Sequence, residues 1–333
     1  MKMLRIPGSM LILLLSFLAL SLSTSVPLAW ATAGTITEFP VPTAGSNPGG
    51  VTLGPDGKMW FTEQSGNKIG RITISGTITE FPVPTGFGGP FGITSGPDGN
   101  LWFNEYQGNQ IGRITISGTI TEFPVPTAGS DLVGITAGPD GNLWFNEYQG
   151  NQIGRITISG VITEFALPSN CGVSFGCQPF GITSGPDGNL WFTENFGSKI
   201  GRITTSGVIT EFAVPSVNSF PFGITAGPDG NLWFAERNGN QIGRITTSSV
   251  ITEFGLTCPV FCGPAFITAG PDGNLWFAES PGNNIGRITT SGVITEFPVP
   301  TASSTPLGIA SGRGDKVWFT ESGGNKIGRI STR

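Results

Sequence analysis

The chain has 333 residues, of which 52 are Gly, 26 are Pro and 12% are charged, and its formal net charge at pH 7 is −5. It contains no His, which excludes a Ser-His-Asp triad, an imidazole base and a His-ligated metal. The 24 Phe and 8 Trp residues argue against disorder as the source of the Gly and Pro content, because disordered segments are poor in aromatic residues.

The first 31 residues have the features of a secretory signal peptide. Lys2 and Arg5 supply a basic start, residues 10–22 form an apolar run, and the Ala-Trp-Ala sequence ending at Ala31 fits a cleavage site. We therefore expect cleavage after Ala31 and secretion to the extracellular space; an uncleaved anchor is the alternative. Cleavage removes two of the 17 basic residues and leaves 15 against 22 acidic ones, a net charge of −7. Such a protein is a poor partner for nucleic acid or for an anionic membrane.

One unit repeats along the rest of the chain. Each copy contains the pattern G-P-D-G-N-L-W-F-x-E, then G-N-x-I-G-R-I-T, then I-T-E-F-x-V-P. In the second copy, β-branched and aromatic residues between Gly-rich turns predict strands over residues 91–95, 100–105, 110–116 and 119–125. Four antiparallel strands in a unit of this length are typical of a β-propeller blade. Seven Trp residues mark the copies, at spacings of 42, 42, 47, 42, 43 and 42: Trp60, Trp102, Trp144, Trp191, Trp233, Trp276 and Trp318.

The two ends of the chain supply complementary parts of one unit. The last copy stops after Thr332 without an I-T-E-F strand, whereas the segment from Thr35 to Val41 carries an unpaired one. We predict an all-β fold, a single seven-bladed β-propeller domain over residues 32–333 with four antiparallel strands per blade. The N-terminal strand completes the last blade and closes the ring, which removes exposed sheet edges. An open solenoid is the alternative, but its terminal repeats should be atypical caps.

The repeat also predicts structural ion pairs between neighbouring strands. A two-residue turn at Ser75 and Gly76 would place Arg71 opposite Glu80 on the next strand. The same register applied to other copies, and to the closure of the ring, gives four pairs: Arg71–Glu80, Arg113–Glu122, Arg155–Glu164 and Arg329–Glu38.

Four Cys residues lie in the two connections that lengthen the repeat beyond 42 residues. In an exported protein an even number of Cys residues favours disulfides. We predict the local bridges Cys171–Cys177 and Cys258–Cys262; free thiols or a bridge between the two loops are the alternatives.

We expect function on the face that carries the variable loops. In a propeller, the connections from fourth to first strand and from second to third strand share one face, here called the top face. One set of candidates there is the Glu that ends each second strand. These carboxylates would bind a cation or act in acid–base chemistry, or each would cap its own hairpin. They are Glu63, Glu105, Glu147, Glu194, Glu236, Glu279 and Glu321, of which Glu321, Glu279 and Glu63 are our catalytic candidates.

A second set of candidates is apolar and aromatic. Several residues begin the inner strands, and others follow the second strands. Together they would line an aromatic mouth suited to a hydrophobic or sugar-like ligand, or they would pack between blades. The ligand-binding candidates are Phe91, Tyr106, Tyr148, Phe180, Phe222 and Arg237.

These repeat motifs resemble the virginiamycin B lyase (streptogramin lyase) family, which is related to NHL-type repeats. The resemblance covers essentially the whole chain after the signal peptide and implies a seven-bladed propeller. It also implies a carbon–oxygen lyase that opens a cyclic depsipeptide antibiotic by elimination. In that reaction a His takes the proton next to the ester, Mg²⁺ stabilises the resulting charge, and the ester oxygen leaves.

The residues that the resemblance assigns to this chemistry are mostly replaced. The two His positions hold Ala265 and Leu307, the Glu two residues before the second His is Thr305, and a first-blade Tyr is Gly49. Glu321 does match a family Glu, but every repeat carries an equivalent Glu. Proton abstraction by His is therefore excluded.

We predict a secreted, virginiamycin B lyase-like propeller that binds a small molecule, glycan or peptide through its top face. We expect a monomer without a cofactor, and no nucleic-acid or membrane partner. The alternative is a lyase that uses a Glu base and Mg²⁺, since burial can raise the pKa of a Glu into a useful range.

Overall fold

The structure is a computed structural model that describes residue 1 and residues 33–168, 176–258 and 261–333. By its internal contacts the chain divides into Met1–Trp30 and Ala31–Arg333, and the fold described below belongs to the second unit. In the described residues there is no helix that is long and apolar enough to cross a membrane.

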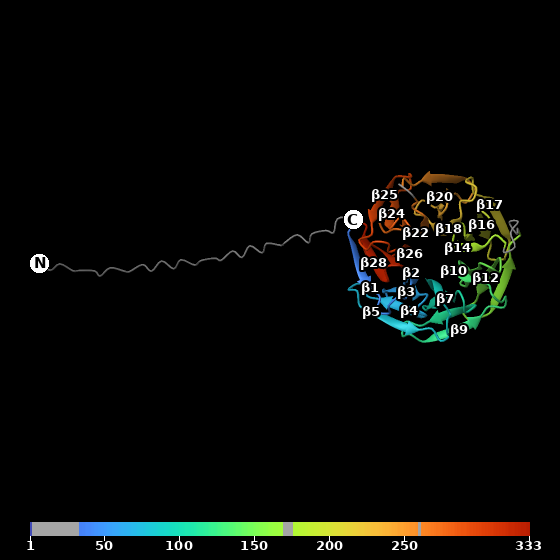
Figure 1. Cartoon of the computed structure of the whole chain (residues 1–333), viewed down its shortest axis with the longest axis horizontal. Coiled ribbons are helices and arrows are strands. Elements are labelled where there is room, and N and C mark those ends of the chain that lie inside the picture. Colours follow the sequence, from blue (N-terminus) through green and yellow to red (C-terminus); the bar gives the residue numbers. More distant parts are fainter. Residues whose placement is uncertain (2–32, 169–175, 259–260) are drawn as a thin grey trace. The chain divides into compact units, whose positions relative to one another are not determined.

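The described part of Ala31–Arg333 forms seven four-stranded antiparallel sheets, each of which is one blade of a β-propeller (Figure 1). In blade one, from the centre outward, these are β2 (Pro48–Leu53), β3 (Met59–Glu63), β4 (Lys68–Ile72) and β5 (Ile78–Pro82). Blade two has β6 (Pro90–Ser95), β7 (Leu101–Glu105), β8 (Gln110–Ile114) and β9 (Ile120–Pro124). Blade three has β10 (Leu132–Ala137), β11 (Leu143–Glu147), β12 (Gln152–Ile156) and β13 (Ile162–Ala166). Blade four has β14 (Pro179–Ser184), β15 (Leu190–Glu194), β16 (Lys199–Ile203) and β17 (Ile209–Ala213).

Blade five has β18 (Pro221–Ala226), β19 (Leu232–Glu236), β20 (Gln241–Ile245) and β21 (Ile251–Gly255). Blade six has β22 (Pro264–Ala269), β23 (Leu275–Glu279), β24 (Asn284–Ile288) and β25 (Ile294–Pro298). Blade seven has β26 (Pro306–Ser311), β27 (Lys316–Glu321), β28 (Lys326–Ser331) and the N-terminal strand β1 (Ile36–Pro40).

The ring closes as predicted. Strand β1 pairs antiparallel with β28, and Ile36 lies opposite Ile330. In Figure 1 this pair is the blue strand beside the red one. Each inner strand contacts the inner strand of the next blade, including β26 with β2. The expectation of a seven-bladed propeller completed by its N-terminal strand is confirmed.

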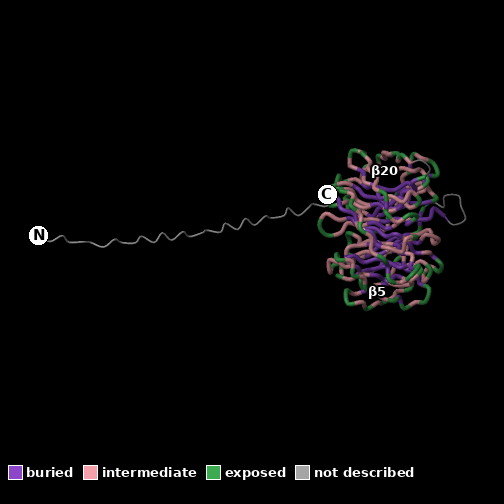
Figure 2. The backbone as a smooth tube through the Cα atoms, turned by 60° about the vertical axis from the view of Figure 1, so that its left-hand side comes forward, coloured by how far each residue is buried: buried purple, intermediate pink, exposed green. Residues whose placement is uncertain are grey.

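The hydrophobic core lies between neighbouring blades, and the loops at both ends of the strands carry most of the exposed residues (Figure 2). Trp60 of blade one is fully buried and packs with Leu101 and Phe103 of blade two. Its ring also stacks on Phe81, with 5.5 Å between centroids. The Arg71 guanidinium lies over the Trp60 ring at 5.3 Å. The Trp of each repeat therefore joins its own blade to the next.

The structure corrects the four predicted Arg–Glu pairs. Arg71 lies opposite Thr79, and Glu80 lies opposite Gly70. The turn is a residue longer than predicted, with Gly76 at φ +92° and a hydrogen bond from Thr73 N to Thr77 O of 3.0 Å. A shift of one residue moves every side chain of a strand to the other face of the sheet.

The same register applies at the other three predicted pairs. Arg113 lies opposite Thr121, Arg155 opposite Thr163 and Arg329 opposite Thr37. The Arg–Glu pairs Arg113–Glu122, Arg155–Glu164 and Arg329–Glu38 were therefore wrong for the same reason. The Glu residues instead bond to other groups, with 2.8 Å from Lys68 Nζ to Glu80 Oε2 and from Lys326 Nζ to Glu38 Oε2.

One of the two predicted disulfides lies within the described residues. Cys258 and Cys262 are bonded to each other. Cys177 is disulfide-bonded, but Cys171, its predicted partner, lies outside the described residues.

Candidate functional site

The inner strands begin with a bulge that turns side chains toward the centre of the ring. In blade two, Pro90 pairs with Glu105 and Ile93 with Phe103, and the register shifts between Pro90 and Ile93. The other six blades have a shift at the same place. A bulge re-aims a side chain next to a site. Here the neighbouring strands are so close that a Cβ on Gly92 would collide with the carbonyl oxygen of Val133.

An aromatic cluster fills the centre of the ring at this level. The ring centroids of Phe91 and Phe180 are 6.0 Å apart, and those of Phe222 and Phe266 are 5.4 Å apart. The cluster also includes Val133 and the completely buried Ala265. Edge-to-face and tilted contacts of this kind stabilise aromatic clusters.

Cavities lie on both sides of this cluster. The inner one, of about 140 Å³, runs along the channel and is lined by strand residues such as Ile135 and Ile182. The outer one, of about 400 Å³, is here called the top pocket. It is lined by Asn47, Gln64, Phe91, Tyr106, Val133, Phe180, Phe222, Arg237, Ser280, Thr305, Leu307 and Ser322.

The top pocket contains five of the six predicted ligand-binding residues. They are Phe91, Tyr106, Phe180, Phe222 and Arg237. The sixth, Tyr148, packs edge-on against Phe180, with 5.9 Å between centroids, and is not a lining residue. The structure thus brings five of the six candidates together around one pocket, and their role in binding stays a prediction.

Sequence reasoning missed the polar side of the top pocket. Gln64, Ser280 and Ser322 line it, and each follows the Glu of a second strand, as Tyr106 and Arg237 do. The same repeat position would have identified them. It also missed Phe266, which follows Ala265 where other inner strands have Gly and which packs against the aromatic cluster.

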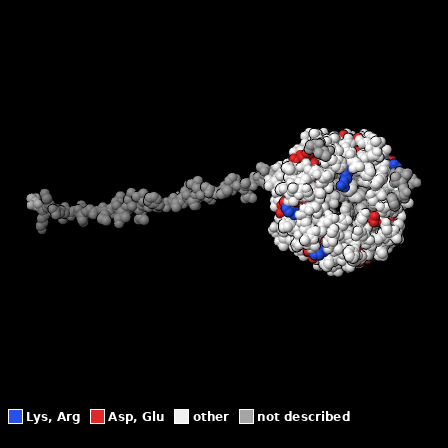
Figure 3. Space-filling model, in the orientation of Figure 1, with Lys and Arg blue, Asp and Glu red and all other residues white. Residues whose placement is uncertain are grey.

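Two titratable groups line the top pocket, and neither accepts a proton near neutral pH. Burial, with the nearby charge of Asp131, raises the pKa of Tyr106 to about 12. Burial lowers the pKa of Arg237, but a guanidinium remains protonated in proteins. The pocket is therefore an apolar cup with one cation and several neutral polar groups. The face of the propeller in Figure 3 likewise carries few charged side chains, separated by uncharged surface.

The seven Glu residues at the ends of the second strands are buried away from the top pocket. All seven are 0% exposed, and none of them lines the pocket. Burial raises the pKa of Glu63 and Glu279 to about 7 and that of Glu321 to about 8. The negative charge of a Glu on the outer strand of the same blade adds to this, as Glu80 does for Glu63. These surroundings favour the protonated carboxyl.

Mg²⁺, which the resemblance implies, does not fit the residues present. Such a cation prefers carboxylate and other hard oxygen ligands in a near-octahedral arrangement. In the part of the chain that the structure describes, the lining of the top pocket offers amide and hydroxyl groups but no carboxylate. Glu321, the one matching residue, is fully buried with its pKa raised to about 8 by burial.

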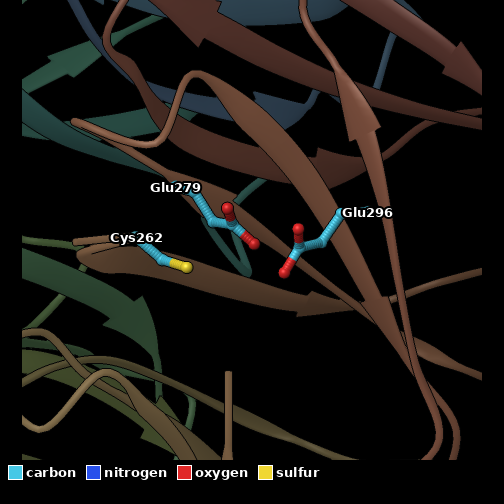
Figure 4. A group of neighbouring side chains, drawn as sticks. All are labelled: Cys262, Glu279 and Glu296. Atoms are coloured by element: carbon cyan, nitrogen blue, oxygen red, sulfur yellow. The ribbon is translucent and has the colours of Figure 1, made fainter. Parts of the chain in front are cut away.

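One other cluster has the composition of a metal site. Cys262, Glu279 and Glu296 each place a potential ligand atom within 4.8 Å of the others (Figure 4). Cys262 is bonded to Cys258, so it has no thiolate to offer. Asn284 donates to Glu279 Oε2 at 3.1 Å. The cluster is thus explained by the disulfide and by packing within blade six.

The positions that the resemblance assigns to catalysis gather around the top pocket. Leu307 and Thr305 line it, and Ala265 lies in the aromatic cluster. Gly49 is buried, and its carbonyl accepts a hydrogen bond from Thr320 Oγ1 at 2.7 Å. Of the assigned positions, Ala265, Leu307, Thr305 and Gly49 carry no group that exchanges a proton near neutral pH, and Glu321 is fully buried.

Comparison with known proteins gives consistent matches over the propeller. The sequence model of the virginiamycin B lyase family matches residues 29–175 and 169–333. A solved virginiamycin B lyase from Staphylococcus aureus is 44% identical, with a TM-score of 0.84, over 89% of this chain and 99% of that one. A solved streptogramin B lyase is 40% identical, with a TM-score of 0.85, over 90% of this chain and 98% of that one.

Two further comparisons concern the same group of enzymes. A His-to-Ala form of the Staphylococcus aureus enzyme, described as catalytically inactive, was solved with quinupristin; it is also 44% identical, with a TM-score of 0.84, over 89% of this chain and 99% of that one. A virginiamycin B lyase from Bacillus licheniformis is 51% identical over 40 residues, which are 12% of this chain and 14% of that relative.

Proposed function

The chain belongs to the virginiamycin B lyase family, and we propose that it binds an apolar cyclic ligand in the top pocket without opening the ring of that ligand. A streptogramin B antibiotic is the first ligand to test, because a solved relative is described with quinupristin. Smaller peptides and glycans with an apolar face belong to the same proposed class.

The observation that carries this proposal is that no base is found among the described residues that line the top pocket. Those residues include no carboxylate, Cys, Lys or His; the Asp131 carboxylate interacts with Tyr106 but is not a lining residue. Leu307 and Ala265 stand where the resemblance places His residues. General-base catalysis requires a group within hydrogen-bond reach of the proton to be removed. Ligand binding makes no such demand.

The shape and chemistry of the top pocket support the binding part of the proposal. Its volume of about 400 Å³ lies within the usual range for small-molecule sites, which are mostly apolar with a few placed polar groups. Phe180 and Phe222 supply the apolar wall, and Arg237 and Gln64 supply donors.

A lyase that uses a Glu base has less support. Glu63 and Glu279 have pKa values raised to about 7 by burial, which suits a base. However, they are 0% exposed, and no wall of the top pocket contains them.

Secretion and a monomeric state are also part of the proposal. The signal-like sequence of the first 31 residues supports export. The Cys258–Cys262 disulfide adds support, because disulfides persist in oxidising compartments. A protein recovered from the medium should begin at Thr32, and N-terminal sequencing tests this; recovery with Met1 in the cell pellet would contradict it.

The proposed binding is tested by isothermal titration calorimetry with quinupristin. We expect saturable binding that weakens at least about tenfold in Phe180→Ala and Phe222→Ala, because each change removes a large apolar contact. Ile116→Ala, on an exposed side chain of the opposite face, is the matched control. No detectable heat at high antibiotic concentration, or equal affinity in all variants, would contradict the proposal.

A further inference from the structure

The first turn of blade seven differs from that of the other six blades. Blades one to six have the sequence G-P-D-G, and blade seven has Gly312-Arg313-Gly314-Asp315. In blade two, Asp98 Oδ1 accepts a hydrogen bond from the indole N–H of Trp102 at 3.0 Å. The other five G-P-D-G turns make the same bond, from Trp60, Trp144, Trp191, Trp233 and Trp276.

Trp318 of blade seven has lost this carboxylate. It is 1% exposed, yet no side chain in the described part of the chain accepts from its indole N–H. Asp315 does not replace the missing group, because its carboxylate faces Arg333, with 3.6 Å from Oδ1 to Nε. The turn also has a different shape, since its left-handed residue is Gly314, at φ +66°.

A cavity of about 450 Å³ lies beside Trp318, between blades seven and one. Trp318 lines it together with an apolar wall that includes Met59 and Ile72. The cavity is lined by turns that join first to second strands and third to fourth strands. These turns lie on the face opposite the top pocket, so the cavity opens on that face. We call it the seam pocket.

Basic side chains border the seam pocket. The guanidinium of Arg313 crosses from blade seven onto blade one and lies so close to Gly57 that a Cβ there would collide with it. Among the described residues Arg313 has no ion pair or hydrogen bond, whereas Lys58, on the other wall, already pairs with Asp56, with 3.6 Å from Nζ to Oδ2. The equivalent glycines of blades two to six have no neighbour within 4 Å of such a Cβ, so this arrangement is specific to the seam.

We propose that the seam pocket binds a small carboxylate with an apolar body. The ligand's carboxylate takes the place that Asp occupies in the other six blades, accepts the Trp318 N–H and pairs with Arg313, while its apolar part lies against Met59 and Ile72. In the other six blades the equivalent Trp N–H donates to a carboxylate. A carboxylate is therefore the acceptor expected for the Trp318 N–H. This site is independent of the function proposed for the top pocket.

The test is a titration of the ¹⁵N-labelled protein with benzoate, followed by the indole N–H resonances in two-dimensional NMR spectra. Trp318→Phe assigns the Trp318 resonance by its disappearance. We expect benzoate to shift that resonance in a saturable way and to leave the six Asp-bonded indoles unmoved. Benzyl alcohol, which keeps the ring but has no charge, should cause little shift.

Two variants locate the ligand's carboxylate. Arg313→Ala should weaken benzoate binding about tenfold, because it removes a charged hydrogen-bond donor; Arg333→Ala, on the same edge of the blade, is the control and should leave binding unchanged. Grafting the usual turn (Arg313→Pro, Gly314→Asp, Asp315→Gly) should move the Trp318 resonance toward the other six and abolish its response to benzoate. An unmoved Trp318 resonance, an equal response to benzyl alcohol, or full affinity in Arg313→Ala would each overturn the proposal.

Discussion

Arg237 lies over the ring of Phe222, with 5.1 Å from its guanidinium carbon to the ring centroid. Both residues line the top pocket, and burial lowers the Arg237 pKa without removing its charge. A partly desolvated cation held against an aromatic face is a strong recognition element. It combines a flat apolar surface with directed donors at one side of the pocket.

Arg237→Ala should weaken binding of a streptogramin B antibiotic about tenfold, and Arg237→Lys should recover only part of the loss, since Lys lacks the planar donor fork. Calorimetric titration measures both changes. Arg244→Ala is the matched control, because Arg244 lies over Trp233 of the same blade, at 5.6 Å, away from the top pocket. If Arg237→Ala and the unmodified protein bind the antibiotic with equal affinity, Arg237 does not contribute to binding.

The stability of the protein should fall as the pH rises from about 5 to about 8. Burial raises the pKa of Glu147 to about 7 and that of Glu105 and Glu236 to about 8, whereas the unfolded chain has ordinary Glu pKa values near 4.5. The folded state therefore binds more protons in this window. The stability that these carboxyls contribute is fully present below the pKa that they have in the unfolded chain. It is lost as the pH rises through their pKa in the folded protein.

Urea denaturation between pH 5 and 8.5 measures this slope. Glu105→Gln should reduce the slope of the unfolding free energy against pH by about the contribution of one titrating carboxyl, because an amide does not titrate. Ile116→Ala, on an exposed side chain that does not titrate, is the control and should leave the slope unchanged. A stability that rises over this window would show that the buried carboxyls are ionised in the folded protein.

Glu38 should matter to the closure of the ring. It accepts hydrogen bonds from Thr301 N at 2.9 Å, Thr301 Oγ1 at 2.8 Å and Lys326 Nζ at 2.8 Å. Burial opposes its ionisation, but these donors hold the pKa of Glu38 below its ordinary value. Glu38→Ala should therefore destabilise the fold by about 2 kcal/mol, as expected for hydrogen bonds to a charged group.

Thermal and urea unfolding measure that loss. Glu164→Ala, which removes the two equivalent hydrogen bonds from Thr127 but no bond from a Lys, is the comparison within the ring. If the closure is as tightly bonded as the other seams, Glu38→Ala should cost at least as much as Glu164→Ala, because it also removes the Lys326 contact. A negligible effect of Glu38→Ala beside a clear effect of Glu164→Ala would indicate that β1 contributes little to closure.

The repeat made the fold predictable and concealed the details that depend on turn geometry. Seven Trp residues at spacings of 42 to 47 residues, an unpaired strand at the N-terminal end and the lack of that strand in the last copy were enough to predict the closed ring. The Arg71–Glu80 pairing was wrong because sequence alone did not reveal that the turn before β5 holds an extra residue with Gly76 at positive φ. One residue of register decides which face a side chain takes.

In the candidate site, too, some features were predictable from the sequence and others depended on how the loops pack. The aromatic residues at the starts of the inner strands were predictable because bulky apolar side chains at equivalent positions must meet at the axis. The burial of Glu321 was not predictable, because it depends on how two separate loops pack: Gly324, in the turn after β27, lies against both Glu321 and Ser304, which belongs to the connection before β26. The loss of the Asp acceptor at Trp318 is visible in the sequence, but its importance depends on the cavity beside that ring.

The central claim is that this member of the virginiamycin B lyase family binds a cyclic ligand without opening its ring. The most direct test is to incubate the purified protein with a streptogramin B antibiotic and Mg²⁺, and to separate the mixture by liquid chromatography with fragment-resolving mass spectrometry, using a genuine lyase as the positive control. We predict that the cyclic antibiotic is recovered intact under conditions in which the control converts it fully. A linear isomer that accumulates in proportion to the concentration of this protein would contradict the claim.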